Sequence, residues 1–114
     1  MHVREAFLKR ANHRKLAPYK MEDIDGAFIR SMSKGTRSRI ESLASGSKSA
    51  KDCSEIRWIV IRDCFVDEEG DSILKREDKS SFDAWDDSLI EPMFNAIMEI
   101  SNVNDDDRAA FEKN

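Results

Sequence analysis

The chain has 114 residues, of which 37% are charged and 39% are hydrophobic. A domain of this length buries a modest core and leaves little room for a deep, enclosed active-site cleft. Its longest apolar run, residues 58–61, is far shorter than the roughly 20 residues that cross a bilayer, so we expect no membrane-spanning segment. Two cysteines, Cys53 and Cys64, are too few for a secreted disulfide scaffold and are interpreted as reduced thiols of a cytoplasmic protein.

Charge is distributed unevenly along the chain. Residues 1–62 contain 14 Lys/Arg and 7 Asp/Glu, a net charge of +7, whereas residues 63–114 contain 5 and 16, a net charge of −11. Between copies of the protein, opposite poles favour head-to-tail contact. The split therefore predicts self-association as a ring or a spiral. Neutralisation of the two halves within one globule is the alternative.

Residues 1–16 are predicted to form a separate N-terminal helix. Apolar residues recur at helical spacing within residues 3–15, and charged residues occupy many of the other positions. The recurring residues are Val3, Phe7 and Ala11. Pro18 ends the helix, because a proline disfavours helical geometry in the residue before it. A cleaved targeting peptide has a similar pattern, but an ordinary surface helix is the simpler interpretation.

Residues 17–32 predict a β-hairpin. Apolar and polar residues alternate over residues 19–24, and a second, mostly apolar segment covers residues 27–32. Asp25 and Gly26 lie between them, and this pair is typical of a type I′ turn, which needs positive φ at both central residues. An irregular loop is the alternative.

Residues 33–114 predict a helical body. Ser33 can cap a helix that ends near Leu43, and residues 45–49 are small and polar, as in a flexible loop. Residues 56–66 are apolar on two helical faces, which is typical of a central helix, although their β-branched run also permits a buried strand. Asp52 and Glu55 fit the N-terminal cap of this central helix.

A turn and a short helix are expected next. Residues 67–71 form an acidic turn in which Gly70 takes the left-handed conformation, and residues 77–86 form the short helix. The whole chain is thus predicted to be one mainly helical domain with an N-terminal β-hairpin.

A long late helix follows, and its apolar stripe is expected to face the core. Ser88 and Glu91 fit its N-terminal capping box, and Asn102 fits its C-terminal cap. Asn104 then caps a last short helix. Met98 is expected nearer the surface than the stripe. The stripe consists of Leu89, Ile90, Met93, Phe94, Ile97 and Ile100.

No catalytic or metal-binding pattern is recognisable in the sequence. His2 and His13 are the only histidines, and neither lies near a candidate nucleophile along the chain. The spacing of the two histidines and two cysteines matches no zinc site, and acidic residues 63–71 lack the order of a calcium-binding loop. We therefore predict a non-enzymatic protein that holds no metal and no other cofactor.

Nucleic-acid binding is the alternative function. Residues 31–39 are basic and rich in hydroxyl groups, as phosphate-contacting segments often are. The pI of about 5.2 and the absence of aromatic residues between these basic positions argue against this function. A small regulator that contacts nucleic acid through residues 34–39 therefore ranks second.

Several short motifs follow one another over residues 17–114 in a characteristic order. The hairpin ends in residues 28–30 and leads to a helix start with Ser33 and Arg37. The central run then enters an acidic glycine turn, the late apolar stripe ends in Ser101, and residues 111–114 close the chain. This order resembles the tail assembly chaperones of long-tailed phages and of prophages. Residues 1–16 match no part of that family's pattern.

The resemblance implies a chaperone that binds the tape measure protein and helps to recruit tail tube protein subunits. It further implies action in the host bacterial cytoplasm and absence from the finished virion. Methionines of the late helix either pack in the core or line an adaptable groove for a partner. The candidate partner-binding residues are Phe28, Arg30, Arg37, Arg39, Met93 and Met98.

Overall fold

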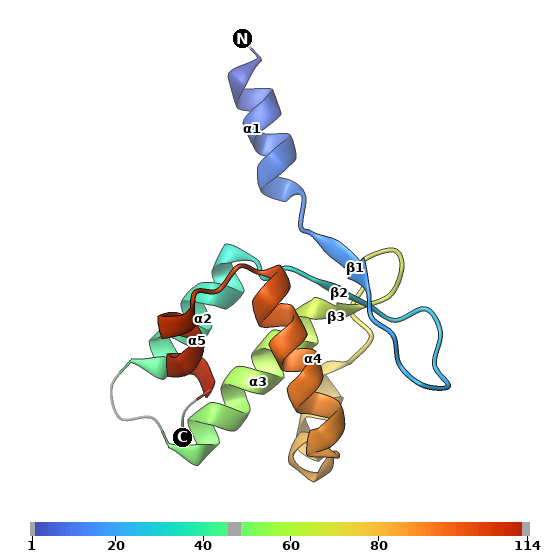
Figure 1. The fold of residues 1–114 in the computed structure, drawn as a ribbon. Helices are drawn as coiled ribbons and strands as arrows, with labels where there is room; N and C mark the ends of the chain where they lie inside the picture. The colour runs from blue at the N-terminus through green and yellow to red at the C-terminus, as the bar shows by residue number, and fades with distance from the viewer. Residues whose placement is uncertain (1, 46–48, 113–114) are drawn as a thin grey trace.

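The structure is a computed structural model that describes residues 2–45 and 49–112 (Figure 1). It is mainly helical with a small three-stranded antiparallel sheet, as the sequence predicts. The molecule measures 50 × 39 × 26 Å along its principal axes. The elements are α1 (Val3–Asn12), β1 (Leu16–Pro18), β2 (Phe28–Arg30), α2 (Lys34–Ala44), α3 (Ala50–Cys64), β3 (Phe65–Val66), the 3-10 helix η1 (Arg76–Ala84), α4 (Asp87–Ile100) and α5 (Asp105–Glu112).

Helix α3 is the centre of the core. It packs against α2, α4, α5 and η1, and it is buried on two faces, as predicted. Its buried residues are Cys53, Ile56, Trp58, Ile59, Val60, Ile61 and Cys64. An edge-to-face triad of Trp58, Phe82 and Trp85 attaches η1 to this helix, with ring centroids 5.4–6.5 Å apart.

The cap of α3 lies one turn earlier than the sequence predicted. Ser49, not Asp52, is the N-cap residue, and its hydroxyl accepts a hydrogen bond from the Asp52 backbone N–H at 3.2 Å. The Asp52 carboxylate in turn accepts from the Ser49 backbone N–H at 3.2 Å, which completes a capping box. The predicted flexible loop at residues 45–49 falls mostly on residues 46–48, outside the described part of the chain.

The predicted hairpin is present, but its strands are placed differently. Strand β1 pairs with β2 so that Leu16 lies opposite Arg30, and β2 also pairs with β3. Residues 19–27 form the connecting loop, and its tight turn lies at Met21–Ile24, where the Ile24 N–H donates to the Met21 carbonyl at 3.3 Å. The predicted type I′ turn at Asp25 and Gly26 is wrong, because Gly26 takes positive φ of 85° but Asp25 does not. Pro18 extends the sheet instead of only ending a helix, since β1 is an edge strand, where a missing N–H is tolerated.

Helix α4 covers the core opposite α2, and its rotation corrects three predictions. Its N-cap is Asp86, whose side chain accepts from the Ser88 N–H, so Ser88 and Glu91 do not form the expected capping box. Leu89 is 45% exposed, although it was expected to face the core, and Met98 is fully buried, although it was expected near the surface. The buried arc runs through Ile90, Met93, Phe94, Ile97 and Met98.

The predicted ends of the late helices are confirmed. Asn102 takes φ of 56° after α4, and its N–H bonds to the Glu99 carbonyl while the Val103 N–H bonds to the Met98 carbonyl. These two bonds form a Schellman motif. Asn104 then caps α5, because its side-chain oxygen accepts from the Asp107 N–H at 2.8 Å.

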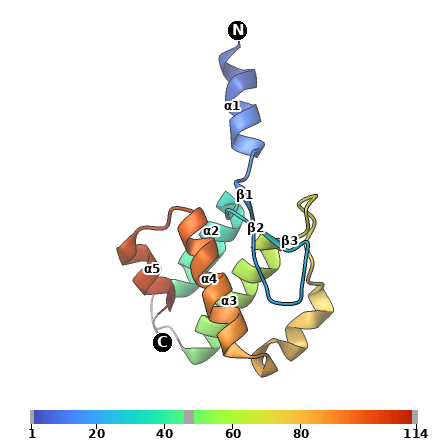
Figure 2. The same ribbon diagram turned by 45° about the vertical axis from the view of Figure 1, so that its right-hand side comes forward.

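Helix α1 stands away from the body. None of its residues is buried, and Val3 and Phe7 are 81% and 66% exposed. Both views of the ribbon show it projecting beyond the sheet, with only its C-terminal end near the rest of the molecule (Figures 1 and 2). The helix predicted from residues 3–15 is thus present in shortened form, but its apolar residues cover no part of the core.

The rotation of α4 is testable with a pair of alanine substitutions. Phe94 is fully buried and Leu89 lies half-exposed on the same helix, so Phe94→Ala should cost about 3–5 kcal/mol of unfolding free energy and Leu89→Ala less than about 1 kcal/mol. Urea unfolding followed by circular dichroism measures both values. Equal losses in the two variants would contradict this placement of the helix.

Candidate functional site

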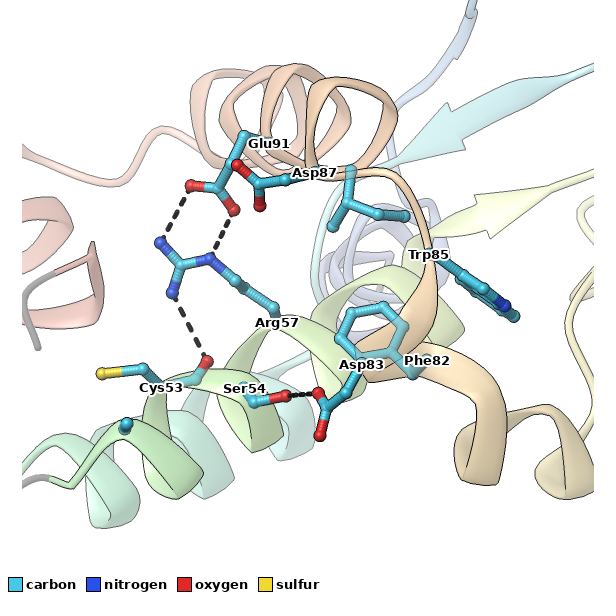
Figure 3. Close-up of a pocket in the computed structure, with 10 residues that line it drawn as sticks. Cys53, Ser54, Arg57, Phe82, Asp83, Trp85, Asp87 and Glu91 are labelled. Carbon is cyan, nitrogen blue, oxygen red and sulfur yellow. Dashed lines mark hydrogen bonds and ion pairs between the residues drawn. The ribbon is translucent and has the colours of Figure 1, made fainter.

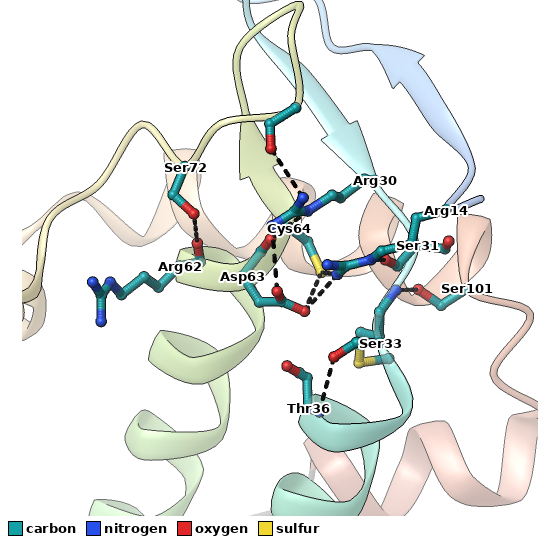
Figure 4. Close-up of polar contacts among 12 residues, drawn as sticks. Arg14, Arg30, Ser31, Ser33, Thr36, Arg62, Asp63, Cys64, Ser72 and Ser101 are labelled. Atoms are coloured by element: carbon teal, nitrogen blue, oxygen red, sulfur yellow. Dashed lines mark hydrogen bonds and ion pairs between the residues drawn. The ribbon is translucent and has the colours of Figure 1, made fainter. Parts of the chain in front are cut away.

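A charged cluster around Asp63 connects the N-terminal segment to the core (Figure 4). The Arg14 guanidinium lies 2.6 Å from one carboxylate oxygen of Asp63, and the Arg30 guanidinium lies 3.5 Å from the other. Arg14 also donates to the Ser31 carbonyl, and Arg30 donates to the Asp63 and Gly70 carbonyls. The cluster therefore joins the base of α1, strand β2, the end of α3 and the acidic turn.

Electrostatics in this cluster favour the charged form of Asp63 and the neutral form of Cys64. Burial opposes the charged form of Asp63, but hydrogen bonds from Arg14 and Thr36 and the charges of Arg14 and Arg30 lower its pKa below the usual value. Burial and the neighbouring Asp63 carboxylate strongly raise the pKa of the Cys64 thiol. Such a thiol stays protonated and unreactive near neutral pH. Cys53 and Cys64 are both buried and share no disulfide, as predicted.

A polar pocket of about 330 Å³ lies between α3, η1 and α4 (Figure 3). On one wall Arg57 makes a bidentate ion pair with Glu91, with 3.0 Å between Nη2 and Oε1, and its guanidinium lies 4.7 Å from the centre of the Phe94 ring. On the other wall the Ser54 hydroxyl donates to the Asp83 carboxylate. Arg57, Glu91, Ser54 and Asp83 are thus paired with one another across the pocket walls, and Cys53 and Asp87 complete its polar lining.

In residues 2–45 and 49–112, no group of three or more His, Cys, Asp or Glu side chains is placed to hold a metal ion. Over the same residues, no helix has both the length and the apolar character to cross a membrane. His2 and His13 are exposed on either side of α1.

The predicted partner-binding residues do not form one surface. Arg37 pairs with Asp107 at 2.8 Å and lies over the Phe111 ring, so it holds α5 against α2. Arg30 is committed to the Asp63 cluster. Met93 and Met98 belong to the core. Phe28 is half-buried in β2 and Arg39 is exposed on α2, and these two are not brought together.

The structure has an open apolar groove of about 330 Å³, and Met93 of the late helix lines it. The sequence left such a groove open as the alternative to core packing for the methionines of this helix. It lies where the 19–27 loop, the end of α3, the residues on either side of η1 and the first turns of α4 meet. Leu89 forms part of its edge because the rotation of α4 leaves this side chain outside the core. The lining residues are Met21, Ile61, Phe65, Leu74, Trp85, Leu89, Ile90 and Met93.

Exposed apolar side chains gather in two separate regions. Within the described residues, seven large apolar side chains are exposed. The first group belongs to α1 and β1 and consists of Val3, Phe7, Leu8 and Leu16. The second group contains Leu89, which lines the groove, and two neighbours of lining residues. Ile24 is bridged to Met21, and Ile73 precedes Leu74 in the chain. Grouped exposed apolar side chains mark surfaces that bind other macromolecules.

The sequence did not identify which apolar side chains of these two regions are exposed, and the reason is physical. A stripe such as Leu89 to Ile100 shows that a helix is amphipathic, but its width does not define the centre of the buried arc. A signal was nevertheless present in residues 3–15, where a helix with a weak apolar face is followed by the helix-ending residue Pro18.

Comparison of the chain with known protein families, with curated proteins and with solved structures finds no match.

The role of the Asp63 cluster is testable by its pH dependence. Because the pKa of Asp63 is lowered by folding, its contribution to stability is present above the unfolded-state value of about 3.9 and is lost as the pH falls through the folded-state value. Asp63→Asn should therefore lower the unfolding free energy by about 1–3 kcal/mol at pH 7, and this deficit should shrink below about pH 4. Asp71→Asn, at an exposed position of the adjoining turn, is the control. A deficit that persists unchanged at pH 2 would contradict the charge-based role.

Proposed function

We propose that this protein is a non-enzymatic assembly chaperone of the long-tailed phage type. In this role it binds the tape measure protein, helps to recruit tail tube subunits and associates with itself as a ring or spiral. It acts in the bacterial cytoplasm and leaves before the virion is complete. The observation that carries the proposal is the pair of exposed apolar regions, on α1 and at the groove.

Protein binding accounts for these regions better than catalysis does. A small domain gains stability from each apolar side chain that it buries, at about 25 cal/mol per Å². Leaving Phe7 largely exposed therefore forgoes stability, and such surfaces are retained where a partner covers them. Arg57 and Glu91 in the polar pocket, and Asp63 with its two arginines, are paired within the chain, whereas the apolar regions have no partner of their own.

The order of motifs supports the particular kind of partner. Three elements follow one another in the order that the resemblance implies: the Phe28–Arg30 strand, the helix capped by Ser33 and the acidic turn at Gly70. The nucleic-acid alternative is weaker, because Arg37 is engaged by Asp107 and Glu41. Two cations of its basic segment, Lys34 and Arg39, remain exposed on α2.

The proposal is testable by the solubility of its client. The tape measure protein encoded beside this chain should aggregate when it is produced alone in bacteria, because it is long and apolar. Co-production with this protein should raise its soluble fraction several-fold, and the two should elute together in gel filtration. An unrelated acidic helical protein of similar size serves as the control.

An unchanged soluble fraction would contradict the chaperone role. A salt-sensitive shift of labelled DNA or RNA that is lost in Arg39→Glu would instead support the nucleic-acid alternative, since phosphate contacts weaken steeply with salt.

A further inference from the structure

The exposed apolar face of α1 needs a partner. The helix has ten residues, none of them buried, and isolated helices shorter than about 12–15 residues are marginal in water. Val3 and Phe7 are one turn apart on the same face, and Leu8 lies beside them. Contact of this face with another apolar surface would stabilise both the helix and the surface that receives it.

The α1 face cannot reach the groove of its own chain. Arg14 is held by Asp63 and by the Ser31 carbonyl, and Lys15 exchanges hydrogen bonds with Ser31. Only His13 lies between these anchors and the end of α1, and one residue spans at most about 3.6 Å. The helix also leaves one end of β1 while the groove-lining loop leaves the other, so the helix and the loop point in different directions (Figures 1 and 2).

The charges of the two surfaces are complementary. Helix α1 carries Arg4, Lys9 and Arg10 against one acid, Glu5. The groove is flanked by exposed acids in the 19–27 loop and at the start of α4, which are Glu22, Asp23, Asp25, Asp86 and Asp87. Lys20 lies in the same loop, and Lys75 and Arg76 follow the lining residue Leu74, but the five acids outnumber these three cations. A basic helix docked there would gain both apolar contact and favourable charge pairing.

We infer that α1 of one copy docks in the apolar groove of the next copy. Phe7 and Val3 enter the groove beside Leu89 and Trp85, and Arg4 and Arg10 face the acids around it. Because a helix on one side of the protomer meets a groove on another, the contact is heterologous and continues into a ring or an open spiral. The inference rests on the self-association in the proposed function and assigns its interface.

A membrane surface is the competing partner for a basic amphipathic helix. It would cover α1 but would leave the groove, with Leu89, Ile24 and Ile73 near it, exposed to water. A second copy covers both regions with one contact, and for this reason the structure favours it.

The decisive experiment uses two full-length variants, each defective on one side of the contact. Phe7→Asp disables the helix and leaves the groove intact, while Leu89→Asp disables the groove and leaves the helix intact. Both side chains are exposed, so both variants should fold, as circular dichroism and thermal unfolding will verify. Ser81→Asp adds the same charge at an exposed position of η1 and serves as the control.

Sedimentation equilibrium over a range of concentrations should show that the wild type and Ser81→Asp form oligomers. Each of the other two variants should associate about tenfold or more weakly, since each places a charge in an apolar contact. An equimolar mixture of Phe7→Asp and Leu89→Asp should form a heterodimer and nothing larger, because only one intact helix and one intact groove can meet. A reciprocal two-fold dimer would also pair in this mixture through one intact contact, but its wild type would stop at the dimer, whereas a head-to-tail contact lets the wild type grow beyond two copies.

The inference is overturned if the wild type stays monomeric at high concentration, or if the mixture does not pair. Binding of monomeric wild type to anionic vesicles, with loss in Phe7→Asp, would assign α1 to a membrane instead. If the wild type is monomeric and Leu89→Asp no longer keeps the tape measure protein soluble, the groove belongs to the client. That result would overturn this interface and the proposed self-association, and would leave the role as a chaperone of the tape measure protein standing.

Discussion

The ion pairs of Asp63 fix the relation between the N-terminal segment and the rest of the molecule. A carboxylate that is largely removed from water is unfavourable unless it is paired and hydrogen-bonded, and here Arg14 and Arg30 supply both needs from segments far earlier in the chain. Asp63 stands at the end of the central helix α3, so the edge of the sheet is held at the end of the core. The same contacts determine where α1 leaves the body, and they commit its apolar face to solvent or to a partner.

Local signals in the sequence were sufficient for most elements of the fold. The position of a helix end is determined by short-range hydrogen bonding, because the N–H or carbonyl groups there need a partner. This is the role of Ser33, Asn104 and Asn102. The displaced cap of α3 shows the limit of such signals, because Ser49 and Asp52 are both good capping residues. In the structure both act in one capping box, with Ser49 as the N-cap and Asp52 at N3.

The candidate site was harder to predict because it depends on tertiary rotation. Shifting the buried arc of α4 moves Met98 into the core and Leu89 to the edge of the groove, and nothing in the spacing of the stripe distinguishes the two arrangements. The strand pairing of the hairpin also depends on tertiary contacts. Asp25 and Gly26 indicate a turn, but the strand that pairs with β2 is selected by Arg14 and Lys15, which anchor the chain beside Ser31.

Charged side chains of the basic half and the acidic half pair with each other inside the protomer. Arg37 reaches Asp107 and Arg57 reaches Glu91, as Arg14 reaches Asp63, and each pair joins the basic half to the acidic half. The halves are therefore interleaved rather than arranged as two poles, and net charge alone does not define a direction of assembly. A direction of assembly is defined only where charge and apolar surface coincide, at α1 and at the groove.

Because α1 is too short to be stable alone, ordering it would use part of the free energy of docking. Such a contact is reversible at moderate concentration, which is the behaviour that an assembly factor requires if it must leave the structure that it helps to build.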